Sequence, residues 1–324
     1  MTTAADDARW MGATLALSQR GVGRTGPNPP VGCVIVRDGR VIGRGWTQPG
    51  GRPHAEAMAL AQADQDARGA TAYVTLEPCA HDSSRGPACA ASLITAGIAR
   101  VVVAAGDPDT RTNGKGLAKL AAAGISLVTG VRCPEAEAIM AGFFSRQRRR
   151  RPHITLKLAV SLDGSVAMTS GESKWITGDR ARAHAHLERA RADMILVGRG
   201  TLDADSPRLD VRLEGLEDRA PIIAVMSSTP APDGLRHLRD LQALAAVTDA
   251  DTVLAEGGAA LASSLVAADL VDRLLLYRAP ILVGGRPALA AIGLANLADA
   301  HGRWAPAAVI ALGTDRLETY HRIR

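Results

Sequence analysis

A small set of histidine, glutamate and cysteine residues constrains the fold of this chain more than any other feature of its sequence. His54-Ala55-Glu56 begins one predicted helix, and Cys79 and Cys89 flank the start of another. One imidazole and two thiolates form a ligand set that suits Zn²⁺ in tetrahedral geometry. Three ligands of one ion must meet, so the fold has to bring two strand-to-helix junctions together.

The same residues predict a catalytic zinc. Three protein ligands leave the fourth position for water, and zinc lowers the pKa of that water toward ~7. Glu56 follows His54 by two positions, so it can lie beside the ion without binding it and carry a proton. The pattern is typical of hydrolytic deaminases acting on cytosine or adenine. His81 is either a fourth ligand, which would indicate a structural zinc, or a residue of the substrate pocket.

Strand-like and helical segments alternate along the chain. A hairpin is predicted at 31–45, with Asp38-Gly39 as its turn, and helices and strands alternate from there to Val128. A hairpin followed by β-α-β crossovers predicts a mixed sheet with helices on both faces. Further strands are predicted at 153–160, 194–197, 221–225, 252–254 and 273–276, and an antiparallel ribbon at 307–312 and 316–321.

The length of 324 residues exceeds what one hydrophobic core usually supports. We therefore expect two domains, 1–145 and 153–324, joined by an Arg-rich linker at 146–152. The basic run at 146–151 could contact nucleic acid, or it could be a solvated helix end followed by a linker. Because no aromatic residues interleave with the arginines, we favour the second interpretation.

The start of the chain carries Asp6 and Asp7 and lacks the basic and apolar runs of a signal peptide. No segment is apolar for long enough to span a bilayer. We therefore expect a cytoplasmic protein, in which paired cysteines ligate metal rather than form disulfides. Cys33 lies in a strand-like run and is expected to be a small buried hydrophobe, whereas Cys133 has no assigned role.

The segments at 25–32 (TGPNPPVG), 54–56 (HAE) and 75–81 (TLEPCAH) resemble the deaminase half of the bifunctional riboflavin biosynthesis family RibD. The resemblance to this family extends nearly from end to end. It implies a cytidine-deaminase-like, three-layer α/β/α domain in which Asn28 and His81 help to hold a pyrimidine. An amide side chain offers a base both a donor and an acceptor, although Asn28 could also be a simple turn former.

Several positions depart from the family pattern. Thr47 stands where the family usually has a histidine, the segment at 107–110 (DPDT) replaces D-P-N-P, and the loop between Cys79 and Cys89 is one residue longer than usual. These departures concern substrate contacts rather than the zinc ligands. Lys115 could pair with a substrate phosphate or face solvent.

The segments at 157–164 (KLAVSLDG), 171–177 (GESKWIT), 198–212 and 256–258 (EGG) resemble the reductase half of the same family. This resemblance implies a dihydrofolate-reductase-like α/β domain that uses NADPH. A predicted strand is followed by Gly257-Gly258 and then by a helix of small residues. This order allows a ligand to approach the backbone closely, and it presents backbone N–H groups to a phosphate. Because no G-x-G-x-x-G fingerprint follows a strand, the ordinary Rossmann mode is not expected.

The resemblance also implies roles for individual residues of the second half. The implied NADPH contacts are Val160, Trp175, Thr201, Asp205, Ser227, Gly258, Ala259, Ala260, Leu261, Ala262, Ser263 and Ser264. The implied substrate contacts are Lys157, Ser173, Arg189, Leu209, Arg212 and Glu256. Arg189 and Arg212 are expected to bind phosphate, because a guanidinium fork fits phosphate oxygens bidentately. Trp175 could instead belong to the core, and Ser228 fits almost as well as Ser227.

The resemblance implies a bifunctional enzyme with two successive activities. The first is zinc-dependent hydrolytic deamination of 2,5-diamino-6-ribosylamino-4(3H)-pyrimidinone 5′-phosphate, and the second is NADPH-dependent reduction of the ribosyl group to ribityl. It further implies a homo-oligomer formed through the reductase half, with no nucleic-acid or membrane partner. A nucleic-acid base deaminase with an accessory domain is one alternative, although it leaves the second half unexplained. A non-catalytic, zinc-stabilised binding protein is the other.

Overall fold

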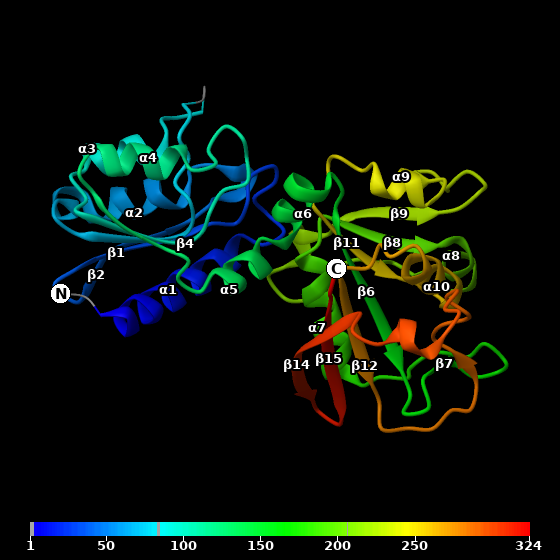
Figure 1. Cartoon of the computed structure of the whole chain (residues 1–324). Helices are drawn as coiled ribbons and strands as arrows, with labels where there is room; N and C mark the ends of the chain where they lie inside the picture. Colours follow the sequence, from blue (N-terminus) through cyan, green and yellow to red (C-terminus); the bar gives the residue numbers. More distant parts are fainter. Residues whose placement is uncertain (1–2, 83–84, 206) are drawn as a thin grey trace. The chain divides into compact units, whose positions relative to one another are not determined.

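The computed structural model describes residues 3–82, 85–205 and 207–324 and divides the chain into two compact units, Met1–Arg150 and Arg151–Arg324. Each unit has its own main β-sheet (Figure 1). The Arg-rich segment that we expected as a linker is largely helical, because α6 (Ala141–Arg149) continues through it. No helix in the described ranges is both long and apolar enough to cross a membrane.

The sheet of the first unit has five strands in the order β2-β1-β3-β4-β5. Strand β1 pairs antiparallel with β2 and β3, whereas β3, β4 and β5 are parallel. Helices α2, α3 and α4 cover one face, and α1 and α5 cover the other (Figure 1). The predicted mixed sheet with helices on both faces is therefore confirmed. The bounds are α1 Ala4–Ser18, β1 Gly32–Arg37, β2 Arg40–Trp46, α2 Ala55–Ala63, β3 Thr71–Leu76, α3 Cys89–Thr95, β4 Arg100–Ala105, α4 Lys115–Ala122, β5 Ser126–Thr129 and α5 Cys133–Ile139.

Two glycines of β2 bring α2 directly onto the sheet. A Cβ at Gly43 would lie 2.2 Å from the carbonyl oxygen of Ala59, and one at Gly45 would lie 2.4 Å from that of Ala55. Only glycine permits this approach, because any larger residue would displace the helix. The close packing holds the first turn of α2 against the sheet, and His54 is the N-cap of this helix.

The second unit contains an eight-stranded sheet in the order β10-β9-β8-β11-β6-β12-β15-β14. The strands from β10 to β12 are parallel, and β15 and β14 extend the sheet antiparallel as the predicted ribbon. We did not predict β7, β10 or β13. The bounds are β6 His153–Val160, β7 Ser165–Ala167, α7 Asp179–Ala190, β8 Met194–Gly198, α8 Arg199–Asp205, β9 Ile222–Met226, β10 Arg236–Leu238, α9 Leu241–Ala245, β11 Thr252–Glu256, α10 Ala259–Ala267, β12 Arg273–Arg278, β13 Arg286–Pro287, β14 Trp304–Leu312 and β15 Asp315–Arg322.

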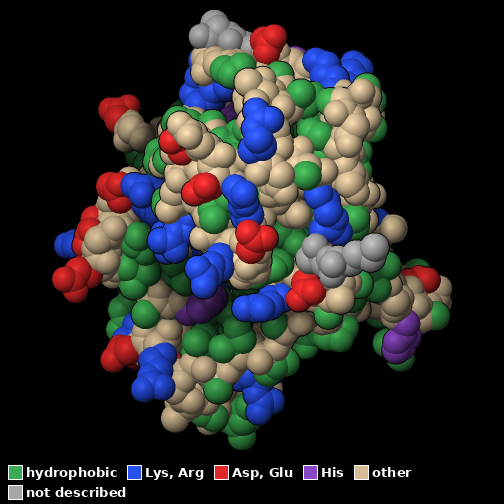
Figure 2. Space-filling model, turned by 90° about the vertical axis from the view of Figure 1, so that its left-hand side faces the viewer, with side chains coloured by type: hydrophobic (Ala, Val, Ile, Leu, Met, Phe, Trp, Pro, Cys, Tyr) green, Lys and Arg blue, Asp and Glu red, His purple; other side chains and the backbone are tan. Residues whose placement is uncertain are grey.

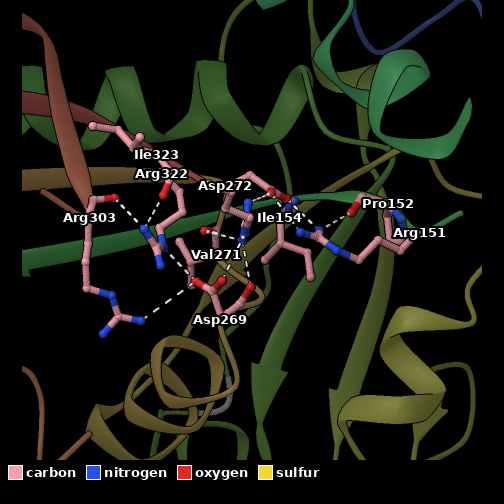
Figure 3. Close-up of polar contacts among 10 residues, drawn as sticks. Arg151, Pro152, Ile154, Asp269, Val271, Asp272, Arg303, Arg322 and Ile323 are labelled. Carbon is pink, nitrogen blue, oxygen red and sulfur yellow. Dashed lines mark hydrogen bonds and ion pairs between the residues drawn. The ribbon is translucent and has the colours of Figure 1, made fainter. Parts of the chain in front are cut away.

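The buried carboxylate of Asp272, just before β12, ties both ends of the second unit together (Figure 3). It accepts two hydrogen bonds from the guanidinium of Arg151, at 2.7 and 2.8 Å, and one from the backbone N–H of Ile154 at 2.9 Å. Arg324 donates a further bond to Asp272 at 2.6 Å. The first and last residues of the unit are therefore held at one point of the sheet.

Candidate active sites

The three predicted zinc ligands lie together in the first unit. The Nδ1 atom of His54 is 3.3 Å from the Sγ atom of Cys89 and 3.7 Å from that of Cys79, and the three ligand atoms lie within 4.8 Å of one another. His54 caps α2, Cys79 follows β3, and Cys89 begins α3. The donor set and its spacing fit a zinc ion, as expected from two adjacent strand-to-helix junctions.

The electrostatics of the two thiols favour a bound cation. A hydrogen bond from Cys89 lowers the pKa of Cys79 to about 4, and the contact with His54 lowers it further against the effect of burial. The backbone N–H of Cys89 also donates to the Cys79 sulfur at 3.3 Å. The same thiol contact and burial raise the pKa of Cys89. A divalent cation bound between the two sulfurs would favour the ionised form of both thiols.

Glu56 lies in the first turn of α2 and is almost completely buried. Burial raises the pKa of its carboxyl group, and the neighbouring His54 opposes part of that effect. Glu56 is not a member of the group of metal-ligating atoms found among the described residues. Its position and its raised pKa suit a group that exchanges protons beside the ion.

The two residues expected to contact the pyrimidine have different surroundings. The side-chain amide nitrogen of Asn28 lies 2.7 Å from the carbonyl oxygen of Gly51 and 3.0 Å from Nε2 of His54, so Asn28 contacts a zinc ligand directly. The Nδ1 atom of His81 is buried and has no hydrogen-bond partner among the described residues. His81 also lies outside the metal-ligating group, which argues against a fourth protein ligand. An unpaired buried nitrogen is expected to meet a ligand atom.

Thr47, which departs from the family pattern, and Lys115 both make hydrogen bonds within the protein, and Asp107 is buried. Thr47 is buried, and its hydroxyl oxygen accepts the backbone N–H of Val31 at 3.0 Å. Lys115 donates to the carbonyl oxygen of Thr110 at 2.7 Å. Burial raises the pKa of Asp107 to about 6. Thr47 therefore supports the start of β1.

Glu77 is a site residue that we missed in the sequence. Its buried carboxylate accepts the backbone N–H groups of Gly114 at 3.0 Å, Gly116 at 2.9 Å, Leu117 at 3.2 Å and Asp107 at 3.4 Å. It thereby joins the segment before Cys79 to the loop that enters α4. An acidic residue between a buried strand and the Pro78-Cys79 pair was the available signal, because a buried carboxylate needs partners.

A large pocket of about 1170 Å³ lies in the second unit, at the carboxyl ends of its parallel strands. This volume exceeds the roughly 300–1,000 Å³ of ordinary small-molecule sites, so the pocket has room for a dinucleotide and a second ligand. The lining includes these residues expected from the sequence: Lys157, Ser173, Trp175, Arg189, Thr201, Leu209, Arg212, Glu256, Gly258, Ala259, Ala260, Leu261 and Ser264. Val160, Ser227, Ala262 and Ser263 are buried outside this lining, and Asp205 is the last residue of α8.

Arg189 has a protein partner that its expected phosphate-binding role did not anticipate. Its guanidinium forms two hydrogen bonds with the buried carboxylate of Glu256, at 2.6 and 2.9 Å, and a third with the carbonyl oxygen of Asp210 at 3.1 Å. Lys157 lies 3.7 Å from the same carboxylate. Arg212 pairs with Asp210 at 3.3 Å and remains largely exposed. Arg212 is therefore the more accessible of the two arginines.

The residues at the start of α10 line the pocket with glycine backbone. The backbone N–H of Gly258 donates to the hydroxyl oxygen of Thr201 at 3.0 Å. A Cβ at Gly257 would lie 2.9 Å from a methyl carbon of Leu261, so this backbone accommodates no larger residue without movement. Trp175 is 66% exposed and lines the pocket, which argues against the alternative that it belongs to the core. Open backbone at a helix start fits the phosphates of NADPH.

The Arg-rich segment contacts protein groups. Arg148 pairs with Glu137 at 2.6 Å and lies over the ring of Phe144, and Arg151 pairs with Asp272. On the face drawn in Figure 2, acidic side chains lie between the basic ones. The contacts of Arg148 and Arg151 agree with the expected helix end.

Residues 4–105 match the zinc-binding region of cytidine and deoxycytidylate deaminases, and residues 152–307 match the RibD C-terminal domain. The riboflavin biosynthesis protein RibD of Escherichia coli K12 is 40% identical, over 91% of this chain and 94% of that protein. A solved structure of Acinetobacter baumannii RibD is 35% identical with a TM-score of 0.89, covering 99% of this chain and 100% of that one.

A crystal structure from Thermotoga maritima is described as a diaminohydroxyphosphoribosylaminopyrimidine deaminase/5-amino-6-(5-phosphoribosylamino)uracil reductase. It is 29% identical with a TM-score of 0.88, covering 98% of this chain and 99% of that one. Similarity across both halves does not favour the nucleic-acid deaminase alternative. The chain belongs to the RibD family, the bifunctional zinc-dependent deaminases and NADPH-dependent reductases of riboflavin biosynthesis.

Proposed function

We propose that the first unit deaminates 2,5-diamino-6-ribosylamino-4(3H)-pyrimidinone 5′-phosphate and that the second unit reduces the ribosyl group of the product to ribityl. The observation that carries this proposal is the cluster of His54, Cys79 and Cys89 with Glu56 buried beside it. The pocket of the second unit supports the reductive step, since it combines a helix-start cradle with several cationic side chains. The names of the Thermotoga maritima activities describe the same two reactions.

In the deamination step, water adds to the amino-bearing ring carbon, a C–O bond forms, and the C–N bond breaks to release ammonia. His54, Cys79 and Cys89 would hold a zinc ion, which would acidify a water molecule and so make the nucleophile available at neutral pH. Glu56 takes the proton from that water and returns it to the departing amino group. The raised pKa of Glu56 suits both transfers. Asn28 and the unpaired Nδ1 atom of His81 hold the pyrimidine edge.

In the reductive step, NADPH held in the pocket would supply the hydride that goes to C1′ of the open-chain imine, and solvent would supply the proton for the imine nitrogen. Lys157, Ser173, Leu209 and Arg212 hold the substrate, and the phosphate binds at Arg212. Arg189 acts through Glu256, whose carboxylate it orients. The cofactor contacts in this proposal are Trp175, Thr201 and the pocket-lining residues of the segment 258–264.

The proposal also includes a homo-oligomer formed through the reductase unit, no nucleic-acid partner, and a cytoplasmic location. The location agrees with the four free cysteines, since zinc-ligating thiols must stay reduced. Light scattering on the purified full chain measures the oligomeric state, and a monomer at micromolar concentration would remove that part of the proposal.

The decisive experiment is an assay on the diamino-pyrimidine phosphate in which ammonia release and NADPH oxidation are scored separately. Glu56→Gln should lower ammonia release by about 10²–10⁴-fold, because general acid-base catalysis typically contributes that much. Its zinc content should equal that of the wild type. Glu135→Gln, which changes an exposed glutamate that pairs with Arg132, is the matched control. Ammonia release by Glu56→Gln at the wild-type rate would refute the assigned role.

A further inference from the structure

The pocket of the second unit extends across the ends of four neighbouring parallel strands. In the order β9-β8-β11-β6, it is lined at Met226 of β9, Gly198 of β8, Glu256 of β11 and Lys157 of β6. Neighbouring strands are about 4.8 Å apart, so the pocket spans roughly 14 Å across this edge. An elongated ligand such as a dinucleotide can therefore lie along the strand ends.

The contacts along this edge indicate which end of the dinucleotide lies at which strand. The β6 side contains the charged group of Lys157, Arg189 and Glu256, which suits the polar substrate. The start of α10, which follows β11 at the middle of the edge, suits the pyrophosphate. The adenosine half of the dinucleotide would then lie at the ends of β8 and β9.

Arg199 stands at that end of the pocket. It directly follows β8 and begins α8. Its Nε–H group donates to the two carboxylate oxygens of Asp203, at 2.9 and 3.1 Å, and an Nη1–H group donates to the carbonyl oxygen of Pro230, beyond β9, at 3.0 Å. These contacts hold the guanidinium between the two strand ends and leave the Nη2 side of the fork for a ligand.

We propose that Arg199 binds the 2′-phosphate of NADPH and thereby sets the preference for NADPH over NADH; this inference rests on the proposed NADPH-dependent reduction. The 2′-phosphate is the group that distinguishes the two cofactors, and a partly exposed guanidinium fork matches its oxygens. Three other cations of the pocket are engaged with protein groups. Lys157 and Arg189 contact Glu256, and Arg182 lies over the ring of Trp175. The carboxylate of Asp203 orients Arg199, although its charge opposes part of the attraction.

The test is the equilibrium binding of NADPH and of NADH to the full zinc-loaded chain, measured by isothermal titration calorimetry. Arg199→Gln should weaken NADPH binding by about 10- to 100-fold, the usual range for lost hydrogen bonds to a charged group. NADH binding should change by less than about 3-fold, because NADH offers no phosphate there. Arg199→Lys should recover part of the loss. Arg236→Gln is the matched control, since Arg236 pairs with Asp249 outside the pocket.

Ionic strength gives a second measurement. In the wild type, added salt should weaken NADPH binding more steeply than NADH binding, and this difference should vanish in Arg199→Gln. If Arg199→Gln weakens both cofactors equally, or neither, the inference is wrong. If that variant does not fold, equal salt dependences for the two cofactors in the wild type overturn the inference instead. A wild type that binds neither cofactor would refute the proposed reductase activity itself.

Discussion

Removing the charge of Asp272 should destabilise the second unit while leaving the first unit intact. Burial opposes ionisation of this carboxyl group, but the hydrogen bonds from Arg151 and from the Ile154 backbone outweigh it. His153 adds to their effect only in acid, because burial lowers its own pKa to about 4. The pKa therefore falls from 3.8 to about 2. A difference of nearly two pH units corresponds to about 2.5 kcal/mol in the free energy of unfolding.

The variant Asp272→Asn keeps the size of the side chain and removes the carboxylate that Arg151 contacts in Figure 3 and that Arg324 also contacts. Breaking a buried pair costs about 3–5 kcal/mol. We therefore expect a loss of about 2.5–4 kcal/mol. Hydrogen exchange read by mass spectrometry should show this loss in peptides from β6 and β12 and not in peptides from β3 and β4. Asp249→Asn is the control, because Asp249 is 57% exposed and its pair with Arg236 should contribute less than about 1 kcal/mol.

The pH dependence has a definite sign. Because the folded-state pKa is lowered, the contribution of Asp272 is fully present above pH 3.8 and is lost as the pH falls toward 2. The difference between wild type and Asp272→Asn should therefore be equal at pH 7 and pH 5 and should narrow below about pH 4. Equal stability of Asp272→Asn and Asp249→Asn at pH 7 would refute this reasoning.

Two further predictions concern the first unit. Removal of zinc with a chelator should stop ammonia release but preserve NADPH oxidation when the deaminated substrate is supplied, and zinc should restore the first activity; simultaneous loss of both would contradict independent sites. Glu77→Gln should destabilise the first unit by about 2–3 kcal/mol, because an amide group would face backbone N–H donors that now reach a carboxylate. Denaturant unfolding followed by hydrogen exchange in α4 measures the second effect, and unchanged protection there would contradict it.

Local chemistry made much of the deaminase site predictable. His54, Cys79 and Cys89 are recognisable because few residue types bind zinc, and because helix starts can be predicted from nearby residues. The hairpin around Asp38-Gly39 and the alternation of strands and helices likewise depend on short-range preferences. The division into two units could also be expected from the sequence, because each unit has its own set of strands.

The partners of charged residues required the tertiary structure. Arg189 appeared in the sequence as a phosphate ligand, but the parallel sheet places Glu256, 67 positions later, against its guanidinium. Glu77 and Asp272 likewise acquire their donors from segments that are distant in sequence. Residue type and spacing determine which chemistry a side chain can perform. Sheet order determines which groups it meets, because pairing across strands depends on packing of the whole unit rather than on neighbouring residues.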